Sequence, residues 1–353
     1  MKKFLVFVFV FMILSTALFA EDAKVMPART GRVYLAPTLI FGSSSFDGNG
    51  ERVTTPDLFM FNLGAAVEYG INDWITAAIQ WVPGFNIMSE YKLPGPPTAR
   101  FRDMGDIFVG AKMQLMGPNA PLSSNAARIA IAPGVKIPLP GPDFEEQARN
   151  AARGNDYTFA TIDKHVFGFG LRSYFDIIVN ENFFINLYNE LILYPIKGDL
   201  KDVGLPALDI YQDILEQAGL TELPSGNSLR GEVNYGFDLT FEIEHVFTQT
   251  FTDSRIQINA GLPFNLSYSP GLKPTFIGSG PFGTALATGA NANALANPNP
   301  SSILFTVRPN VSAFFMGMPL PMEFKASYFL PVWGQNTMAN HTFSFQVRAY
   351  FRI

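Results

Sequence analysis

The sequence predicts an all-β fold: a transmembrane antiparallel up-and-down β-barrel of about 12 strands (14 possible), with short helices in its external loops. Three observations predict it. Hydrophobic residues make up 48% of the 353 residues and charged residues only 16%, which leaves too little charge to cover a soluble surface. Beyond residues 1–20, no apolar run approaches the roughly 20 residues that a membrane helix needs. Apolar and polar residues instead alternate in one segment after another.

Residues 1–20 are predicted to be a secretory signal peptide, which leaves residues 21–353 as the outer-membrane β-barrel. Two lysines precede an apolar stretch from Phe4 to Phe19, and the chain turns polar at Glu21. A charged start followed by a short apolar region is typical of such signals. The alternative is a retained membrane anchor, but no stop-transfer cluster of charges follows the apolar stretch.

The clearest alternation lies in residues 231–246. One face carries the apolar side chains Val233, Tyr235, Phe237, Leu239, Phe241 and Ile243. The other face carries Glu232, Asn234, Gly236, Asp238, Thr240, Glu242 and Glu244. A helix with this spacing would scatter its carboxylates around its whole circumference, so the pattern predicts a strand with one lipid-facing side.

Comparable segments recur along the chain and predict the strands. They lie near residues 31–42, 57–71, 74–82, 105–116, 127–138, 165–178, 183–195, 231–246, 254–269, 303–316, 320–332 and 341–353. Very short connections alternate with longer ones, as periplasmic turns alternate with external loops in bacterial barrels. A soluble β-sandwich or propeller would also alternate. No blade-length repeat is visible, however, and the many phenylalanines on one face favour lipid contact.

Charged residues on the inward phase are expected to line the lumen. The candidates are Arg172, Glu190, Glu242, Glu244, Arg255 and Arg348, and Glu244 is expected to face Arg255 across a hairpin turn. One interpretation is a buried network that fills and rigidifies the lumen, since side chains can largely occupy so small a barrel. The other is a polar constriction that controls passage.

Two external connections carry helical patterns, at residues 142–154 and 206–220. The second is amphipathic. Its apolar face carries the candidate ligand-binding residues Leu208, Tyr211, Ile214 and Leu215. This face would either cap the barrel mouth or collect a hydrophobic solute, and the two roles are compatible. The Gly-, Ala-, Asn- and Pro-rich stretch 278–302 is expected to be a flexible exposed loop.

Several functional classes are disfavoured. The chain has no cysteine, which excludes disulfides, thiolate metal sites and cysteine nucleophiles. A net charge of −5 argues against a nucleic-acid partner. His165, His245 and His341 are expected on the outward phase near strand ends, without a serine or carboxylate placed beside them. No metal-ligand spacing appears. We therefore expect no catalytic residues, no metal, no cofactor and no enzymatic activity.

Three phrases of the sequence resemble a known family of outer-membrane proteins. They are VEYGINDWITAAIQW (67–81), GDIFVGAKMQL (105–115) and ARIAIAPGVKIPLPG (127–141). They are similar to the FadL-like channel superfamily, especially its branch from the meta-pathway of phenol degradation. The resemblance implies a channel for small hydrophobic molecules, with the third and fourth external loops as an entry groove. Fatty-acid channels of this type have fourteen strands and an N-terminal plug, whereas here a short segment from Glu21 to about Thr30 precedes the first strand.

The leading hypothesis is thus an outer-membrane channel for the passive uptake of fatty acids or aromatics. Capture would occur at the apolar face of 206–220, and transit would pass through a mostly filled lumen or a lateral gap in its wall. A structural or adhesive surface barrel and a general porin are the alternatives. The expected partners are outer-membrane lipid, hydrophobic small molecules and the barrel-insertion machinery.

Overall fold

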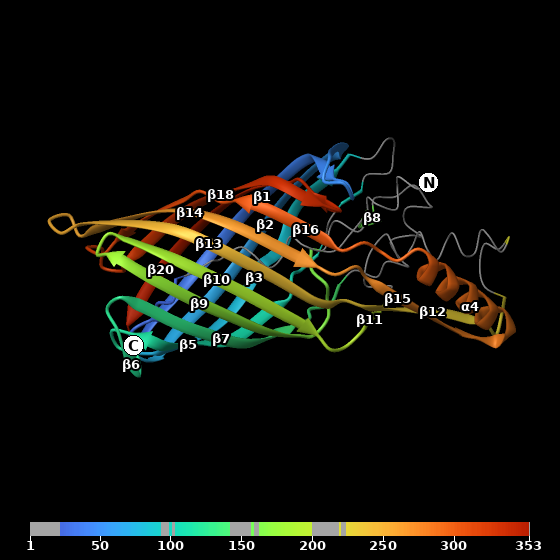
Figure 1. Cartoon of the computed structure of the whole chain (residues 1–353), viewed down its shortest axis with the longest axis horizontal. Coiled ribbons are helices and arrows are strands. Elements are labelled where there is room, and N and C mark those ends of the chain that lie inside the picture. The colour runs from blue at the N-terminus through green and yellow to red at the C-terminus, as the bar shows by residue number, and fades with distance from the viewer. Residues whose placement is uncertain are drawn as a thin grey trace.

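The computed structural model describes residues 22–92, 99–100, 103–141, 157–158, 162–199, 219 and 224–352. Its body is a closed antiparallel β-barrel of 12 strands (Figure 1). The barrel closes where the first strand pairs with the last, from Thr30 opposite Arg352 to Phe41 opposite His341. Closure satisfies the backbone groups that hydrocarbon could not hydrogen-bond. The predicted fold and strand number are therefore confirmed.

Each barrel strand pairs with its neighbours in chain order. The strands are β1 (Thr30–Phe46), β2 (Arg52–Asn72), β3 (Ile75–Tyr91), β5 (Ile107–Gly117), β7 (Ala127–Ile137), β9 (Gly168–Asn180), β10 (Phe183–Tyr194), β13 (Gly236–Phe251), β14 (Ile256–Ser269), β16 (Ser302–Val307) continued by β17 (Asn310–Phe315), β18 (Met322–Gln335) and β20 (His341–Arg352). Four two-residue strands add local pairings: β4 (Ala99–Arg100), β6 (Leu122–Ser123), β8 (Tyr157–Thr158) and β19 (Thr337–Met338).

The strand walls separate two environments, as the alternation predicts. In β13, Leu239 and Phe241 are exposed on the outside, whereas Asp238, Thr240 and Glu242 are buried inside. Around the barrel, the outward apolar side chains include Leu35, Val67, Ile79, Leu171, Leu193, Leu262, Leu266, Val311 and Phe343. An apolar exterior around a polar interior is the arrangement of outer-membrane barrels, in agreement with the expected location in the outer membrane.

The two ends of the barrel differ in their connections. Short turns such as 73–74 and 181–182 lie at the end that also holds the C-terminus (Figure 1). Short turns mark the periplasmic end of bacterial barrels. The opposite end carries the long connections and is therefore extracellular. No helix of the described chain is long and apolar enough to cross a bilayer.

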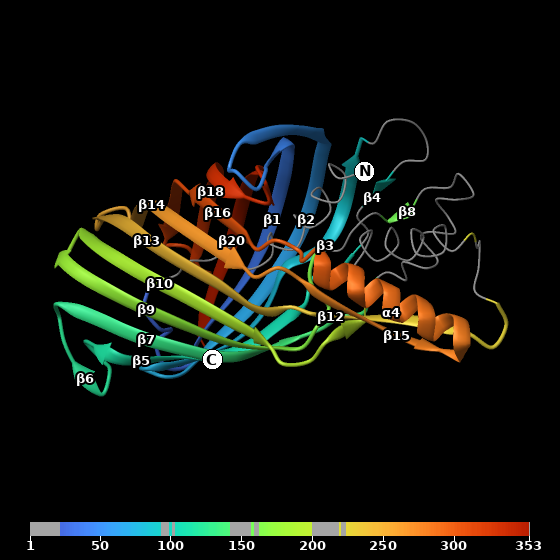
Figure 2. The same cartoon turned by 45° about the vertical axis from the view of Figure 1, so that its right-hand side comes forward.

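At the extracellular end, a small helix-covered sheet projects beyond the barrel (Figures 1 and 2). It consists of β11 (Gly198–Asp199), β12 (Ser228–Asn234) and β15 (Lys273–Ser279), with helix α4 (Gly280–Ala296) packed against it. We call these four elements the extracellular extension. The expected flexible loop at 278–302 is thus wrong over most of its length. The buried face of α4 carries only Gly283, Ala287 and Ala290, small residues that let a helix approach the sheet closely.

The outer edge of β15 is protected by α4. The side chain of Asn291 accepts a hydrogen bond from the Phe276 N–H at 2.7 Å and donates one to the Phe276 carbonyl at 2.8 Å. Its amide thus takes the place of a further strand at that position. Pro274, two residues earlier, has no N–H to offer. Protected edges of this kind prevent pairing with another chain.

Candidate functional site

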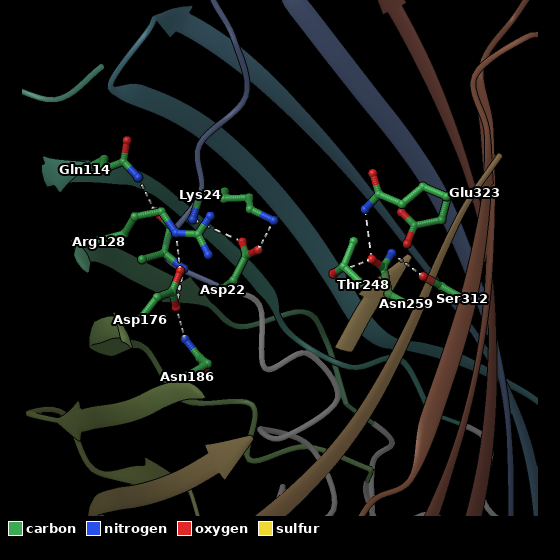
Figure 3. Close-up of polar contacts among 12 residues, drawn as sticks. Asp22, Lys24, Gln114, Arg128, Asp176, Asn186, Thr248, Asn259, Ser312 and Glu323 are labelled. Carbon is green, nitrogen blue, oxygen red and sulfur yellow. Dashed lines mark hydrogen bonds and ion pairs between the residues drawn. The ribbon is translucent and has the colours of Figure 1, made fainter. Parts of the chain in front are cut away.

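The N-terminal segment enters the lumen from the periplasmic end, on the side of β5, β7 and β9. The Ala23 N–H donates to both carboxylate oxygens of Asp176 at 3.1 Å, and the amide of Gln114 donates to the Ala23 carbonyl at 2.9 Å (Figure 3). Lys112 Nζ donates to the Asp22 carbonyl at 2.9 Å. The described residues before the first strand therefore occupy part of the lumen.

Charge fixes this segment in place. Lys24 Nζ lies 2.9 Å from the Asp22 carboxylate. Burial alone would raise the pKa of Asp22, but the charges of Lys24, Arg128 and Lys112 lower that pKa well below its usual value. Asp176, beneath Ala23, is in turn paired with Arg128 at 2.6 Å. The segment is thus held by ionised groups.

Most of the predicted lumen residues do lie inside the barrel, in small charged networks. Arg172 pairs with Glu190 at 2.6 Å. Glu242 pairs with Arg308 at 3.2 Å, and Arg348 pairs with Glu323 at 3.2 Å. Neutral amides complete these networks: Gln80 binds Arg172, Asn265 binds Arg308 and Gln346 binds Arg348. The geometry favours the interpretation of a lumen that is largely filled and rigidified.

Arg255 departs from this prediction. It is exposed in the periplasmic turn before β14, with a positive φ of 52°. Glu244 is not opposite Arg255, because the β13–β14 register places Glu244 opposite Pro263. Glu244 instead accepts a hydrogen bond from Asn310 Nδ2 at 2.8 Å. Strand β13 runs on to Phe251, so the turn lies further from Glu244 than the sequence pattern suggested.

A cavity of about 350 Å³ remains in the periplasmic half of the lumen. On one side it is bounded by the N-terminal segment, and on the other by β13, β14, β17 and β18. Its far wall includes Thr248, Asn259 and Ser312 (Figure 3). Asn259 Oδ1 accepts from Thr248 Oγ1 at 3.0 Å, and Asn259 Nδ2 donates to Ser312 Oγ at 3.0 Å. We call this space the luminal cavity.

His165 is buried at the extracellular rim, and the expectation of an outward histidine without carboxylate partners is wrong for it. Its Nε2 lies 3.0 Å from Asp103 Oδ2, and its Nδ1 lies 2.8 Å from the Leu139 carbonyl oxygen and 3.4 Å from Asp106 Oδ1. Burial would lower the pKa of His165, but the two carboxylates raise it to about 11. His165 is therefore a cation that joins three segments of the chain.

Two lysines extend this cluster across the mouth of the barrel. Lys136 Nζ binds the Asp163 carboxylate and lies 3.7 Å from Asp106. Lys164 Nζ lies 2.6 Å from Asp238. The hydroxyl of Tyr194 donates to the same aspartate at 2.7 Å. We call this cluster the rim network: Asp103, Asp106, Lys136, Asp163, Lys164, His165, Tyr194 and Asp238. All of these side chains are nearly inaccessible to solvent.

The barrel wall is interrupted beside the rim network. The β13–β14 ladder ends at Leu239 opposite Tyr268, and the β12–β15 ladder resumes at Asn234 opposite Lys273. The register is the same on both sides, yet no backbone ladder pairs residues 235–238 with residues 269–272. The two segments are joined instead by the Ser269 hydroxyl, which donates to the Asp238 carboxylate. Gly236 has a positive φ of 69°, which glycine adopts without strain. We call this interruption the wall gap.

An apolar cluster borders the wall gap. It comprises Val166, Ile192, Tyr194, Val233, Tyr235, Leu272, Phe276, Ala287 and Ala290. Tyr235 packs against Tyr194 with ring centroids 5.8 Å apart, and the Phe237 and Tyr268 rings lie 5.8 Å apart. This buried apolar core thus runs from the extracellular extension to the gap. The predicted ligand-binding residues Leu208, Tyr211, Ile214 and Leu215, and both predicted loop helices, lie outside the described residues.

The comparisons with known proteins show the fold. No family model and no curated protein matches the sequence. The structure is similar to the COG4313 outer membrane channel from Pseudomonas putida F1, with a TM-score of 0.60 and 10% identity over 95% of this chain and 100% of that one.

Two further solved structures match less well. The toluene transporter TbuX of Ralstonia pickettii has a TM-score of 0.37 at 9% identity, over 94% of this chain and 92% of that one. A FadL homologue of Pseudomonas aeruginosa has a TM-score of 0.34 at 10% identity, over 97% and 99%. Both TM-scores lie well below that of the COG4313 channel.

Sequence reasoning missed the rim network and the wall gap. Asp103, Asp163 and Lys164 lie in loops where no period shows which side chains will meet. One sequence signal does correspond to the wall gap. Gly236 and Pro270 interrupt two strands at matching distances from the turn that joins them. This signal can be interpreted only when the register of the hairpin shows that the two residues lie near each other.

Proposed function

We propose that this chain is an outer-membrane channel for the passive uptake of small hydrophobic solutes, fatty acids or aromatics. The observation that carries the proposal is the wall gap, bordered by an apolar cluster on the extracellular side and by the buried rim network below. The similarity in fold to an outer-membrane channel supports a transport role.

The lumen is a poor path for an apolar solute. Glu242 and Arg308 are buried and pair with each other, while Arg172 is half-buried and pairs with Glu190 on the neighbouring strand. An apolar molecule passing between them would have to break these pairs and leave charges unpaired in a poorly solvated space, which costs several kcal/mol for each charge. For a solute that has reached the rim network, leaving through the barrel wall therefore costs less free energy than passing down the lumen.

The wall gap supplies a sideways route. Unpaired backbone groups facing hydrocarbon are costly, so a membrane barrel normally keeps its ladders continuous. Here the interruption keeps the register, and Pro270 removes one N–H that would otherwise need a partner. Phe237 is partly exposed at the same level, whereas Tyr235 and Leu272 are buried in the apolar cluster. We propose that solutes are collected at the apolar face of 206–220, pass the apolar cluster and enter the membrane between β13 and β14.

A crosslink across the gap tests this route. The continued register places Phe237 opposite Pro270, so Phe237→Cys with Pro270→Cys can form a disulfide in a chain that has no other cysteine. The matched control is Leu239→Cys with Tyr268→Cys, a directly opposed pair just below the gap. Uptake of a radiolabelled fatty acid or toluene into liposomes is measured before and after reduction.

We expect the oxidised gap variant to lose at least tenfold in uptake rate and to recover on reduction, while the control pair transports equally well in both states. Equal uptake through the oxidised gap variant would exclude the lateral route. If the wild-type protein transported neither solute, the proposed function itself would fail. A large ohmic conductance in planar bilayers would point instead to a general porin.

A further inference from the structure

The luminal cavity has an excess of positive side chains. Among the described residues that line it, six are cationic, namely Lys24, Arg32, Lys112, Arg172, Lys325 and Arg348, and four are anionic, namely Asp22, Glu68, Glu244 and Glu323. Such an excess in a confined space attracts small anions from the periplasm. The side chain best suited to bind such an anion is a cation that has no ion-pair or hydrogen-bond partner in the protein.

Five of the six cations have close partners. Arg32 binds Glu68, Arg172 binds Glu190 and Arg348 binds Glu323. Lys24 binds Asp22, and Lys112 donates to backbone carbonyl oxygens of the N-terminal segment. Within the described chain, Lys325 differs from all of these, because it has no ion pair within 4.0 Å and no hydrogen-bond partner.

The carboxylates around Lys325 are engaged elsewhere. Glu323, two residues before it on β18, binds Arg348 and the Tyr350 hydroxyl. Glu242 binds Arg308 and Asn265. Glu244 accepts from Asn310 and interacts with Lys325 only electrostatically, across the cavity. The Lys325 ammonium therefore faces the cavity without a counter-ion in contact.

Neutral polar groups lie beside this ammonium. The register places Lys325 opposite Ser312 on β17 and opposite Gln346 on β20. Asn259 and Gln257 line the same cavity and bind each other at 2.8 Å. Amides and hydroxyls can solvate an anion by donating hydrogen bonds. Glu244 and Glu323 line the cavity too, so they oppose multiply charged anions and favour a single negative charge.

We propose that the luminal cavity is a binding site for a small monovalent anion, chloride or a short carboxylate such as acetate, held by the Lys325 ammonium. This site is independent of hydrophobic uptake, because it lies in the periplasmic half of the lumen whereas the wall gap lies at the extracellular rim. A bound anion neutralises a partly buried charge that the protein itself leaves without a contact partner.

The quadrupolar line width of chloride in NMR measures this binding directly, because chloride that exchanges with a protein site relaxes faster than free chloride. Wild-type protein in detergent is compared with Lys325→Gln and with Lys273→Gln, which removes an exposed lysine from the extracellular extension. We expect the excess line width of the wild type to fall by half or more in Lys325→Gln and to stay unchanged in Lys273→Gln.

Equal line widths in the wild type and Lys325→Gln would overturn the proposal. If Lys325→Gln does not fold, Lys325→Arg keeps the charge and must keep the broadening, whereas Lys325→Met must lose it. Sodium acetate added at constant ionic strength distinguishes the two ligands. Narrowing of the chloride line supports a shared carboxylate site, and an unchanged line overturns the carboxylate part of the proposal. None of these results depends on whether the protein transports a hydrophobic solute.

Discussion

At the residue scale, the ionisable groups of the rim network owe their properties to contacts between distant loops. His165 contacts Asp103, which lies 62 positions earlier in the chain. The same two-carboxylate contact that raises its pKa also ties the connection after β3 to the connection before β9. A histidine near a strand end gives no hint of this in the sequence, because the partners meet only when the barrel has closed.

His165 is therefore expected to behave as a permanent cation. Its pKa of about 11 lies well above the usual pKa of about 6.5. The charge on its ring therefore contributes stability that is complete below about pH 6.5 and is lost progressively as the pH rises from there to about 11. In NMR spectra of histidine-labelled protein, the His165 ring should not titrate between about pH 5 and 9. A titration midpoint near the usual value would contradict the two-carboxylate contact.

Asp106 has the opposite tendency. Burial and the neighbouring Asp163 raise its pKa to about 6, in spite of His165 and Lys136. Because the folded state then holds the proton more tightly than the unfolded chain, ionisation of Asp106 weakens the fold as the pH rises from about 4 to about 6, and the loss is complete above that range.

Asp106→Asn should consequently stabilise the protein at neutral pH and have little effect near pH 4. The amide oxygen can still accept from the Leu139 N–H, which lies 3.2 Å from the carboxylate. A shift of about two pH units corresponds to at most about 3 kcal/mol. Urea unfolding in detergent at the two pH values measures the difference from wild type. A variant that is less stable than wild type at neutral pH would contradict this account.

At the scale of single elements, the extracellular extension shows where local sequence was misleading. The stretch that forms α4 contains three glycines and two asparagines, a composition typical of loops. Its alanines and its packing on β15 outweigh that tendency, because helices gain most of their stability from tertiary contacts. The composition alone would place Asn291 in a loop, but in the structure its side chain hydrogen-bonds to Phe276 at the edge of β15.

Asn291→Ala should loosen the extension without affecting the barrel. Both hydrogen bonds to Phe276 would be lost, so hydrogen–deuterium exchange at the Phe276 amide should accelerate at least tenfold, while amides of β13 keep their rates. Asn293→Ala is the matched control, since Asn293 is exposed on the same helix and its side chain contacts only Asn297. Equal exchange at Phe276 in the two variants would show that Asn291 does not protect the edge.

At the scale of the whole molecule, exposed apolar side chains on strands face two different environments. Those on the barrel wall contact the membrane, whereas those on the extracellular extension contact water. Phe241 on β13 and Ile277 on β15 are similarly exposed, at 40% and 48%, and both lie in strands. Only Phe241 lies on the barrel wall. Phe241→Arg should therefore destabilise the folded protein by about 2–4 kcal/mol, whereas Ile277→Arg should change its stability by less than about 0.5 kcal/mol.

Unfolding by denaturant in lipid vesicles compares the two variants, and photoactivated lipid probes give an independent measurement by labelling Phe241 but not Ile277. Equal destabilisation by the two arginines would mean that the boundary between membrane and water is not where the end of the barrel places it.

The sequence by itself determined the barrel, the strand number and the inward position of most charged side chains. These follow from period-two alternation, which is a local property: each residue's phase is fixed by its neighbours on the same strand. The long connections and their short partners likewise determined which end faces the periplasm.

Only the tertiary structure decided which inward charges pair, which cation is left without a contact partner and where the ladder of the wall is interrupted. Arg172 and Glu190 meet because two strands share a register, and Lys325 lacks a contact partner because Glu323 pairs with Arg348 and Glu244 is bound by Asn310. The wall gap exists only as a relation between residues 235–238 and 269–272. Such relations arise across the sheet, and the alternation along a single strand carries no information about them.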